Sequence, residues 1–172
     1  MISGIVLFED FIDHPKRLFE ELIRDVKWDE RMTARKTASF GVAYNYSQMA
    51  YPFQPFPQNI VSIIQQLEPK IGFEPNNCLI NYYETGKAKM GYHSDQIDHL
   101  AANTGIAIVS LGETRTLRFR NIHDPLIVEN YELQSGSLIY MTQEVQTEWQ
   151  HAIPKSGTEN GRISMTFRNI LQ

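Results

Sequence analysis

The amino-acid sequence predicts an α+β fold that is mainly β: a β-sandwich or barrel supported on one side by two helices near the amino terminus. Both helical patterns fall before Gly72, whereas the chain after it consists of short, apolar-rich segments separated by turn residues. No helical pattern alternates with these later strands, which argues against a parallel α/β sheet. We expect residues 1–172 to form one domain, with the helices in residues 1–76 and the β core in residues 77–172.

Composition excludes several classes of protein. The one cysteine, Cys78, permits neither an intramolecular disulfide nor a cysteine-rich zinc site. No window approaches about 18 apolar residues, and the short apolar run near the start lacks a basic flank, so we expect no membrane span and no signal peptide. A net charge of −4 argues against nucleic-acid binding through bulk charge, although it allows a local basic groove. We expect a cytoplasmic monomer with no obligate protein partner.

The first elements follow from local periodicity. Ile5–Phe8 is expected to form a short strand. Asp13 is expected to cap the first helix, which runs to about Trp28. His14 and Pro15 would occupy its first turn. One face of this helix is apolar at helical spacing, with Leu18, Leu22, Ile23 and Val26.

Residues 32–51 show a ragged pattern of small residues and tyrosines, so we expect strands and turns there rather than a helix. Three prolines then enforce a loop: Pro52, Pro55 and Pro57. A second helix is expected over residues 58–71, with an apolar face formed by Ile60, Ile63, Ile64 and Leu67. Turn residues divide the rest of the chain into short strands. The expected strands are residues 77–84, 106–111, 115–121, 126–133, 137–141 and 162–170.

His93-Ser94-Asp95 is the first pattern that suggests chemistry. On an extended segment, His93 and Asp95 point to the same face because side chains alternate along a strand. One histidine and one carboxylate, joined by a second histidine, form the facial triad of non-haem Fe(II) oxygenases, which keeps coordination positions open. This short spacing also arises by chance, so it is weak on its own.

The second histidine must come from a distant part of the chain. His151 is the best candidate, because apolar residues flank it just before the last strand. A histidine in that setting can also be an ordinary hydrogen-bonded core residue, and both interpretations stay open. The other three histidines are expected at the surface: His14, His99 and His123.

The last strand has one polar face. Polar and apolar residues alternate strictly along it, so four side chains project together: Arg162, Ser164, Thr166 and Arg168. A solvated edge strand would show the same pattern. Arginine also suits the carboxylates of a small dicarboxylic acid, because a guanidinium binds a carboxylate through two parallel hydrogen bonds. A keto-dicarboxylate that arginine holds at one end and iron at the other is 2-oxoglutarate.

Together these residues resemble the AlkB-type 2-oxoglutarate- and Fe(II)-dependent dioxygenases, which repair alkylated nucleobases by oxidative demethylation. The resemblance covers residues 35–170, with four motifs in the family's order. The motifs are Asn81-Tyr82-Tyr83, His93-Ser94-Asp95, Trp149-Gln150-His151 and the closing segment RISMTFRNI. The resemblance implies a double-stranded β-helix (jelly-roll) with two supporting N-terminal helices and a nucleotide-recognition lid.

By position in these motifs, the resemblance assigns His93, Asp95 and His151 to Fe(II), with O2 as a further co-substrate. It assigns five residues to 2-oxoglutarate: Asn81, Tyr83, Arg162, Ser164 and Arg168. Arg162 is expected at the carboxylate far from the iron, and Arg168 toward the iron-chelating end. Ser164 stands where some family members carry Asn, which weakens one expected hydrogen bond.

Residues 35–47 resemble the lid that covers the target base. Tyr46 stands where the family places a ring that stacks on the flipped base, opposite His93. Tyr44 would line the same pocket. The alternative is that both tyrosines only pack the lid against the barrel.

Charged residues near the lid are also expected at the substrate. Four basic residues are candidates for phosphate contacts: Arg35, Lys36, Lys87 and Lys89. Family members that demethylate bases often carry an acid two residues beyond the metal-binding aspartate, where it contacts an exocyclic amine. Ile97 occupies that place here, so either Asp98 takes this role or the substrate is not a methylated adenine or cytosine.

The resemblance implies oxidative demethylation of N-alkylated bases such as 1-methyladenine and 3-methylcytosine in DNA or RNA, releasing succinate, CO2 and formaldehyde. Two alternatives stay open at this point. An oxygenase of the same fold could hydroxylate a protein side chain or a small metabolite, which the acidic composition and Ile97 favour. A noncatalytic β-barrel binding module could instead use the motif residues structurally.

Overall fold

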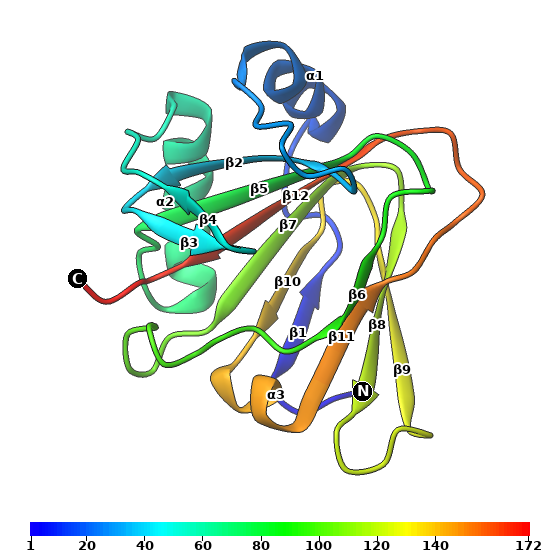
Figure 1. The fold of residues 1–172 in the computed structure, drawn as a ribbon. Helices are drawn as coiled ribbons and strands as arrows, with labels where there is room; N and C mark the ends of the chain where they lie inside the picture. Colours follow the sequence, from blue (N-terminus) through cyan, green and yellow to red (C-terminus); the bar gives the residue numbers. More distant parts are fainter.

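Two β-sheets face each other, and the first two helices lie outside the larger sheet (Figure 1). The structure is a computed structural model that describes residues 1–172. The larger sheet has six strands and the smaller has four, which confirms the mainly β arrangement with helical support. None of the helices combines the length and apolar character needed to cross a membrane.

In the first half of the chain, short strands alternate with two helices. These elements are β1 (Ile5–Phe8), α1 (Pro15–Asp25), β2 (Lys36–Gly41), β3 (Tyr44–Tyr46), β4 (Met49–Tyr51) and α2 (Gln58–Ile71). The second half is nearly all β. Its elements are β5 (Asn77–Tyr83), β6 (Met90–His93), β7 (Ile106–Gly112), β8 (Arg115–Asn121), β9 (Val128–Leu133), β10 (Leu138–Met141), α3 (Gln143–Glu148), β11 (Trp149–Ile153) and β12 (Arg162–Arg168).

Strand β12 lies inside the six-stranded sheet, whose order is β1-β10-β7-β12-β5-β2. It pairs antiparallel with β5 and β7, so Ser164 lies opposite Asn81 on one side and Ser110 on the other. The four-stranded sheet has the order β6-β11-β8-β9, and β3 and β4 form a separate hairpin. Since β12 has neighbours on both sides and all its residues are buried, it is not a solvated edge strand.

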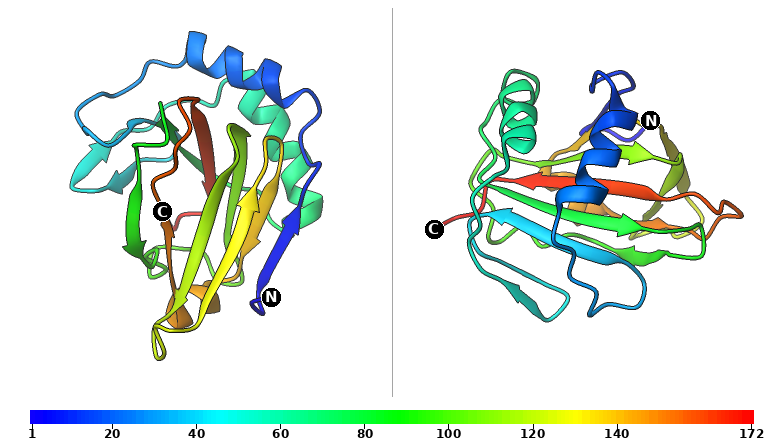
Figure 2. Two further views of the ribbon diagram at one scale, coloured as in Figure 1. Left: turned by 90° about the vertical axis from the view of Figure 1, so that its right-hand side faces the viewer. Right: turned by 90° about the horizontal axis from the view of Figure 1, so that it is seen from above.

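The two faces of β12 lie in different environments, an apolar one outside the sheet and a polar one between the two sheets. Its apolar residues Ile163, Met165 and Phe167 face outward and join a core of 19 buried residues that includes residues of α1 and α2. Figure 2 shows both helices on this outer side of the sheet. A second core of 13 buried residues lies between the sheets. The polar residues of β12 face the same space between the sheets, beside this second core.

The two predicted helices form, with one difference in α1. Helix α2 has the predicted bounds, whereas α1 ends at Asp25, before the predicted Trp28. Trp28 instead lies beyond the helix and packs against the outer core as a partly buried side chain. The N-cap residue of α1 is His14 rather than Asp13, and no side chain caps the helix.

The sequence does not predict three short elements, β6, α3 and β11. They have only four, six and five residues, too few for their periodicity to stand out. Strand β9 starts two residues later than predicted, because Leu126 and Ile127 lie in an exposed turn. Strand β12 likewise ends at Arg168, two residues before the predicted end.

Gly41 ends β2, and replacing it with alanine is expected to destabilise the protein by more than about 3 kcal/mol. Its φ is +82°, and an added Cβ would lie 2.1 Å from the carbonyl oxygen of Asn76. Gly72 is a matched control, with a φ of +84° and no atom within 4 Å of its added Cβ. Gly72→Ala is expected to lower the free energy of unfolding by only about 1–2 kcal/mol. Urea unfolding of both variants measures the difference, and equal losses would contradict the backbone clash at Gly41.

Candidate metal and co-substrate site

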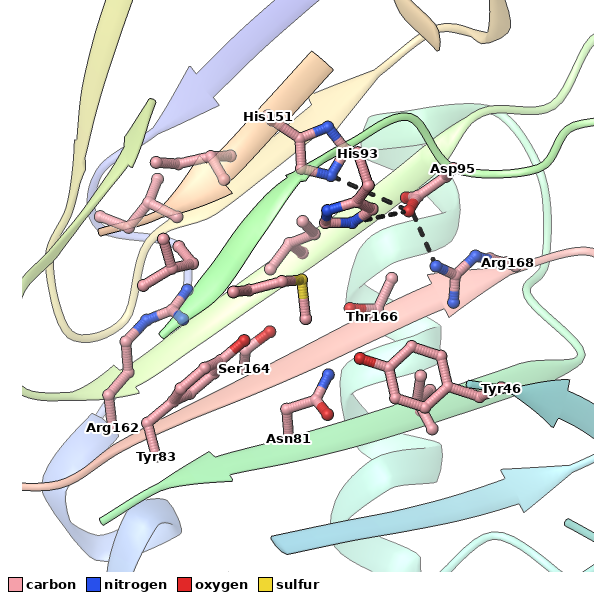
Figure 3. A pocket seen from close by; sticks show the side chains of 16 residues that line it. Tyr46, Asn81, Tyr83, His93, Asp95, His151, Arg162, Ser164, Thr166 and Arg168 are labelled. Atoms are coloured by element: carbon pink, nitrogen blue, oxygen red, sulfur yellow. Dashed lines mark hydrogen bonds and ion pairs between the residues drawn. The ribbon is translucent and has the colours of Figure 1, made fainter. Parts of the chain in front are cut away.

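A cavity between the two sheets collects the polar residues of the sandwich interior (Figure 3). Sixteen residues line it. One wall comes from β5, β7 and β12 of the six-stranded sheet, and the other comes from β6, β8, β9 and β11 of the four-stranded sheet. Its polar lining residues are Tyr46, Asn81, Tyr83, His93, Asp95, His151, Arg162, Ser164, Thr166 and Arg168.

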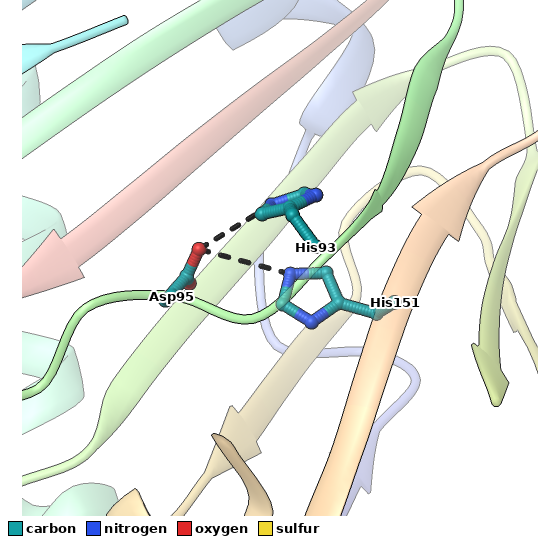
Figure 4. Close-up of side chains that lie close together, drawn as sticks. All are labelled: His93, Asp95 and His151. Atoms are coloured by element: carbon teal, nitrogen blue, oxygen red, sulfur yellow. Dashed lines mark ion pairs between the residues drawn. The ribbon is translucent and has the colours of Figure 1, made fainter. Parts of the chain in front are cut away.

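His93, Asp95 and His151 meet at one end of the cavity, where one ligand atom of each lies within 4.8 Å of the others (Figure 4). Nε2 of His93 lies 3.4 Å from Oδ1 of Asp95, and Nε2 of His151 lies 3.8 Å from the same oxygen. Two imidazole nitrogens and one carboxylate oxygen that converge in this way are the donor set of a two-histidine, one-carboxylate metal site. His151 is therefore more than a packed core histidine.

Strand pairing brings these distant residues together. His93 is the last residue of β6, and it lies directly opposite His151 on β11. Asp95 follows in the loop, where its backbone N–H donates to Oε1 of Gln146 at 2.9 Å. Gln146 is a buried residue of α3 that the sequence analysis did not single out. No pattern in the sequence identifies Gln146, because its contact with Asp95 depends on the path of the loop after β6.

Hydrogen bonding and burial prepare the three side chains for a metal. Nδ1 of His93 lies 2.8 Å from the carbonyl of Gly91, so it carries a proton, and Nε2 faces Asp95. Burial lowers the pKa of His151 to about 4, so this imidazole is neutral at pH 7. Burial alone would raise the pKa of Asp95, but the hydrogen bond with His93 and the charge of Arg168 hold it well below its usual range. Neutral imidazole and ionised carboxylate are the forms that bind a metal.

Arg162 forms the opposite end of the cavity and is 1% exposed. Its Nη2 donates to the hydroxyl of Ser110 at 2.9 Å, and its Cζ lies 5.6 Å from the centre of the Tyr83 ring. Nε and Nη1 have no hydrogen-bond partner. Burial lowers the pKa of Arg162 to about 10. A buried guanidinium without a carboxylate partner is unfavourable, so this end of the cavity suits an anionic ligand.

Arg168 lies beside the metal-site residues, about 20 Å along β12 from Arg162 as measured between backbones. Its Nη2 is 3.4 Å from Oδ2 of Asp95, whereas its buried Nε and Nη1 have no partner. Unpaired guanidinium donors at both ends of one cavity fit a dicarboxylate. The residues present therefore fit Fe(II) and 2-oxoglutarate, and the other three expected co-substrate residues also line the cavity: Asn81, Tyr83 and Ser164.

Arg115 is a second buried arginine near this end of the cavity, and the sequence analysis did not single it out. Its guanidinium donates to the carbonyls of Thr85, Ala88 and Pro154, at 3.4, 2.8 and 2.7 Å. It thereby ties the loop after β5 to the loop after β11. Buried and partly exposed side chains alternate along β8, and Arg115 occupies one of the buried positions, so this alternation was a signal for its burial. A charged residue at the start of a strand is, however, normally exposed.

Tyr46 and Tyr44 of strand β3 have different surroundings. Tyr46 lines the cavity (Figure 3). Tyr44 does not line it, because the hairpin passes beside Arg168 and the Tyr44 ring packs 5.1 Å from that guanidinium. The ring also lies 5.7 Å from His99, which is only partly exposed. The role of Tyr44 in a substrate pocket stays a prediction, since its ring lies next to Arg168 at the metal end of the cavity. His99 is partly exposed, and His14 and His123 are exposed as predicted.

All four basic residues predicted to contact phosphates line one open groove outside the cavity, together with Lys155: Arg35, Lys36, Lys87 and Lys89. Arg35 also donates to the hydroxyl of Tyr46 and to Oδ1 of Asn81. Lys36 forms ion pairs at 2.9 and 3.5 Å with two glutamates, Glu30 and Glu84. The phosphate contacts of these residues stay predictions.

Asp98 does not reach the cavity. Its side chain is 89% exposed, and its only charged partner is His99, 3.6 Å away. The preceding residue, Ile97, packs against the core between the sheets, which turns Asp98 to the solvent. Contact of Asp98 with a base stays a prediction, and Asp95 is the one carboxylate that lines the cavity.

Comparison with known proteins agrees with the metal and co-substrate site described above. The pattern that defines the 2OG-Fe(II) oxygenase superfamily matches residues 13–168. Alpha-ketoglutarate-dependent dioxygenase alkB homolog 3 of Bos taurus is 30% identical over 191 residues, covering 98% of this chain and 67% of that protein. The protein of the same name from Rattus norvegicus is 29% identical, over 98% of this chain and 65% of that protein. This chain thus spans about two thirds of the length of these relatives.

DNA oxidative demethylase ALKBH2 of Homo sapiens is 30% identical over 156 residues, covering 84% of this chain and 59% of that protein. Among solved structures, OsALKBH1 superposes with a TM-score of 0.70 at 17% identity, covering 98% of this chain and 99% of that chain. This structural similarity concerns the fold, and it confirms the predicted mainly β jelly-roll with helical support.

The geometry predicts that Asp95→Ala and His151→Ala lose detectable Mn(II) binding, because each removes one of only three converging ligands. Calorimetric titration with Mn(II) under anaerobic conditions measures this. His123→Ala, at an exposed histidine, is the matched control and is expected to bind as the wild type does. Unchanged Mn(II) affinity in Asp95→Ala would contradict the site.

Arg162→Met is expected to stabilise the ligand-free protein by roughly 1–4 kcal/mol, because it removes a buried charge that has no carboxylate partner. It is also expected to abolish the rise in melting temperature that 2-oxoglutarate causes in the wild type. Thermal unfolding with and without 2-oxoglutarate and Mn(II) measures both effects. Arg17→Met, at an exposed arginine, should change neither. A variant that is strongly destabilised yet still stabilised by 2-oxoglutarate would contradict this role.

Proposed function

We propose that this chain, which belongs to the 2OG-Fe(II) oxygenase superfamily and within it to the AlkB homologues, removes methyl groups oxidatively from alkylated nucleobases. The chain is a dioxygenase that uses Fe(II), 2-oxoglutarate and O2. The nucleobase is the proposed part, and it is supported by relatives that are named as alkB homologues and as DNA oxidative demethylases.

One observation carries the chemistry: the candidate metal site and two incompletely paired buried arginines line the same cavity. In this proposal His93, Asp95 and His151 hold the iron. When bound there, Fe(II), 2-oxoglutarate and O2 together supply an oxidant for an unactivated C–H bond, with 2-oxoglutarate converted to succinate and CO2.

The protein's own residues bind and orient. Arg162 would hold the carboxylate of 2-oxoglutarate that is far from the metal, and Tyr83 would lie beside it. Arg168 would neutralise charge at the metal end, where it already faces Asp95. Apolar lining residues keep this space poor in water, which strengthens each charge interaction: Leu79, Met90, Ile108, Leu117, Leu133 and Ile153.

On the substrate side, Tyr46 is the aromatic residue of the hairpin that lines the cavity. A flipped base that stacks on Tyr46 would place a methyl group of a ring nitrogen toward His93 and Asp95. Oxygen insertion converts this N–CH3 group to N–CH2OH. The C–N bond of that product then breaks to give formaldehyde, and the nitrogen keeps the electron pair and takes up the hydroxyl proton.

The sequence left two other functions open: a noncatalytic binding module, and an oxygenase that hydroxylates a protein side chain or a metabolite. Membership of an oxygenase family and the converging His93, Asp95 and His151 argue against the noncatalytic binding module. Hydroxylation of a protein side chain or a metabolite has a specific observation in its favour, because no carboxylate other than Asp95 lines the cavity to contact an exocyclic amine. It is therefore the competing outcome of the experiment.

The full chain, loaded anaerobically with Fe(II) and 2-oxoglutarate, is exposed to air with oligonucleotides that carry 1-methyladenine or 3-methylcytosine. Single-stranded DNA, duplex DNA and RNA are tested separately, and mass spectrometry follows the methyl group while succinate is measured in parallel. We expect loss of the methyl group with one succinate formed per methyl group removed. His93→Ala should abolish both products, whereas His123→Ala, at an exposed histidine, should keep them.

Succinate formation with intact methyl groups on all three nucleic acids would leave the oxygenase chemistry in place and overturn the nucleobase as substrate. The same assay with peptides and small metabolites would then identify the competing class.

A further inference from the structure

We propose that Arg35 is a positioning residue that couples the hairpin of residues 44–51 to the co-substrate pocket. The proposal rests on the proposed function, because it takes Asn81 as a contact of 2-oxoglutarate and Tyr46 as part of the substrate pocket. It gives Arg35 a role inside the protein, in addition to its place in the open groove lined by Lys36, Lys87 and Lys89.

The Arg35 guanidinium contacts both sites at once. Nη2 and Nε donate to the hydroxyl of Tyr46, and Nε also lies 3.2 Å from Oδ1 of Asn81. Arg35 is half-buried and immediately precedes β2, in which Thr37 pairs directly with Asn81 on β5. One side chain therefore bridges the six-stranded sheet and the separate β3–β4 hairpin.

Arg35 determines which way the amide of Asn81 faces. A guanidinium has only N–H donors and no acceptor, so the carbonyl oxygen of the amide must face it. The amide nitrogen is then turned away from Arg35, toward the side of the cavity where the metal-site residues lie, as Figure 3 shows. From there it can donate to an oxygen of 2-oxoglutarate. The reversed amide would present its oxygen to a carboxylate and repel it.

The same guanidinium holds Tyr46 toward the cavity. Its Cζ lies 5.4 Å from the centre of the Tyr46 ring, and the ring lines the cavity that contains His93 and Asp95. The bond to Arg35 is the only side-chain hydrogen bond made by residues 45–49. The other strand of the hairpin is held separately, through a hydrogen bond between the hydroxyls of Thr37 and Tyr51.

These contacts link the two sites energetically. The Nε group of Arg35 is shared between Asn81 and Tyr46, so a ligand that fixes the Asn81 amide also fixes the guanidinium that holds Tyr46. Binding of 2-oxoglutarate is therefore expected to order the hairpin before substrate arrives. By reciprocity, a hairpin that is held in place increases the affinity for 2-oxoglutarate.

The first experiment measures 2-oxoglutarate binding to the full Mn(II)-loaded chain by calorimetry, without nucleic acid or turnover. Arg35→Met is expected to bind 2-oxoglutarate about tenfold more weakly than the wild type, and Arg35→Lys, which keeps a donor, to lose less. Arg31→Met is the matched control, because Arg31 lies on the same segment and forms only a surface ion pair with Asp29. The control should bind like the wild type.

A double-mutant cycle with Asn81→Ala separates positioning from a general structural effect. If Arg35 acts through the Asn81 amide, Arg35→Met causes little further loss of affinity in the Asn81→Ala background. The same tenfold loss in both backgrounds would overturn the proposal.

Hydrogen exchange tests the link to the hairpin. In the wild type, 2-oxoglutarate with Mn(II) is expected to slow amide exchange in residues 44–51 several-fold, and Arg35→Met is expected to abolish this slowing. Exchange in α2, on the outer side of the sheet, is the internal control and should be equal in both proteins.

Equal 2-oxoglutarate affinity and equal hairpin protection in the wild type and Arg35→Met would overturn the proposal while leaving the proposed function intact. Failure of the wild type to bind 2-oxoglutarate would overturn both. Binding that depends on Arg35, without turnover of any methylated base, would support this inference and overturn only the nucleobase as substrate.

Discussion

Two charged residues are buried on the inner strand β12, and the arrangement of the sheets and helices follows from their burial. Arg162 and Arg168 face the space between the two sheets, where a sandwich normally places its apolar core. The apolar face of the same strand must then be covered from outside, and α1 and α2 provide that cover. The helices thus take over part of the core, which lets a small domain hold a polar site inside its sandwich.

The two sheets contribute different residues to the site. The six-stranded sheet contributes the arginines and Asn81, whereas β6 and β11 of the four-stranded sheet contribute the two histidines. Facing sheets lie about 10 Å apart, a gap that a metal ion and a small dicarboxylate can span. Ligands bound there would join the two sheets and replace the missing partners of the buried guanidinium groups, so binding and stability are coupled.

The residues around the substrate side were harder to predict than the metal site, for a physical reason. Arg35 and Asp98 lie in loops, where neither strand alternation nor register determines the direction of a side chain. The Arg35 side chain points inward, where the hydroxyl of Tyr46 and Oδ1 of Asn81 accept its hydrogen bonds. The Asp98 side chain points outward because the preceding residue, Ile97, occupies the buried position.

Local features could be predicted from the sequence: the alternation of β12, the His93-Ser94-Asp95 spacing, and the apolar faces of α1 and α2. These follow from backbone geometry over a few residues. Three further features became visible in the folded protein: β12 is flanked on both sides, His151 lies opposite His93, and Arg35 contacts Asn81. Each of these depends on strand order and register between segments far apart in the chain, and no local pattern of residues encodes which distant partner a side chain will meet.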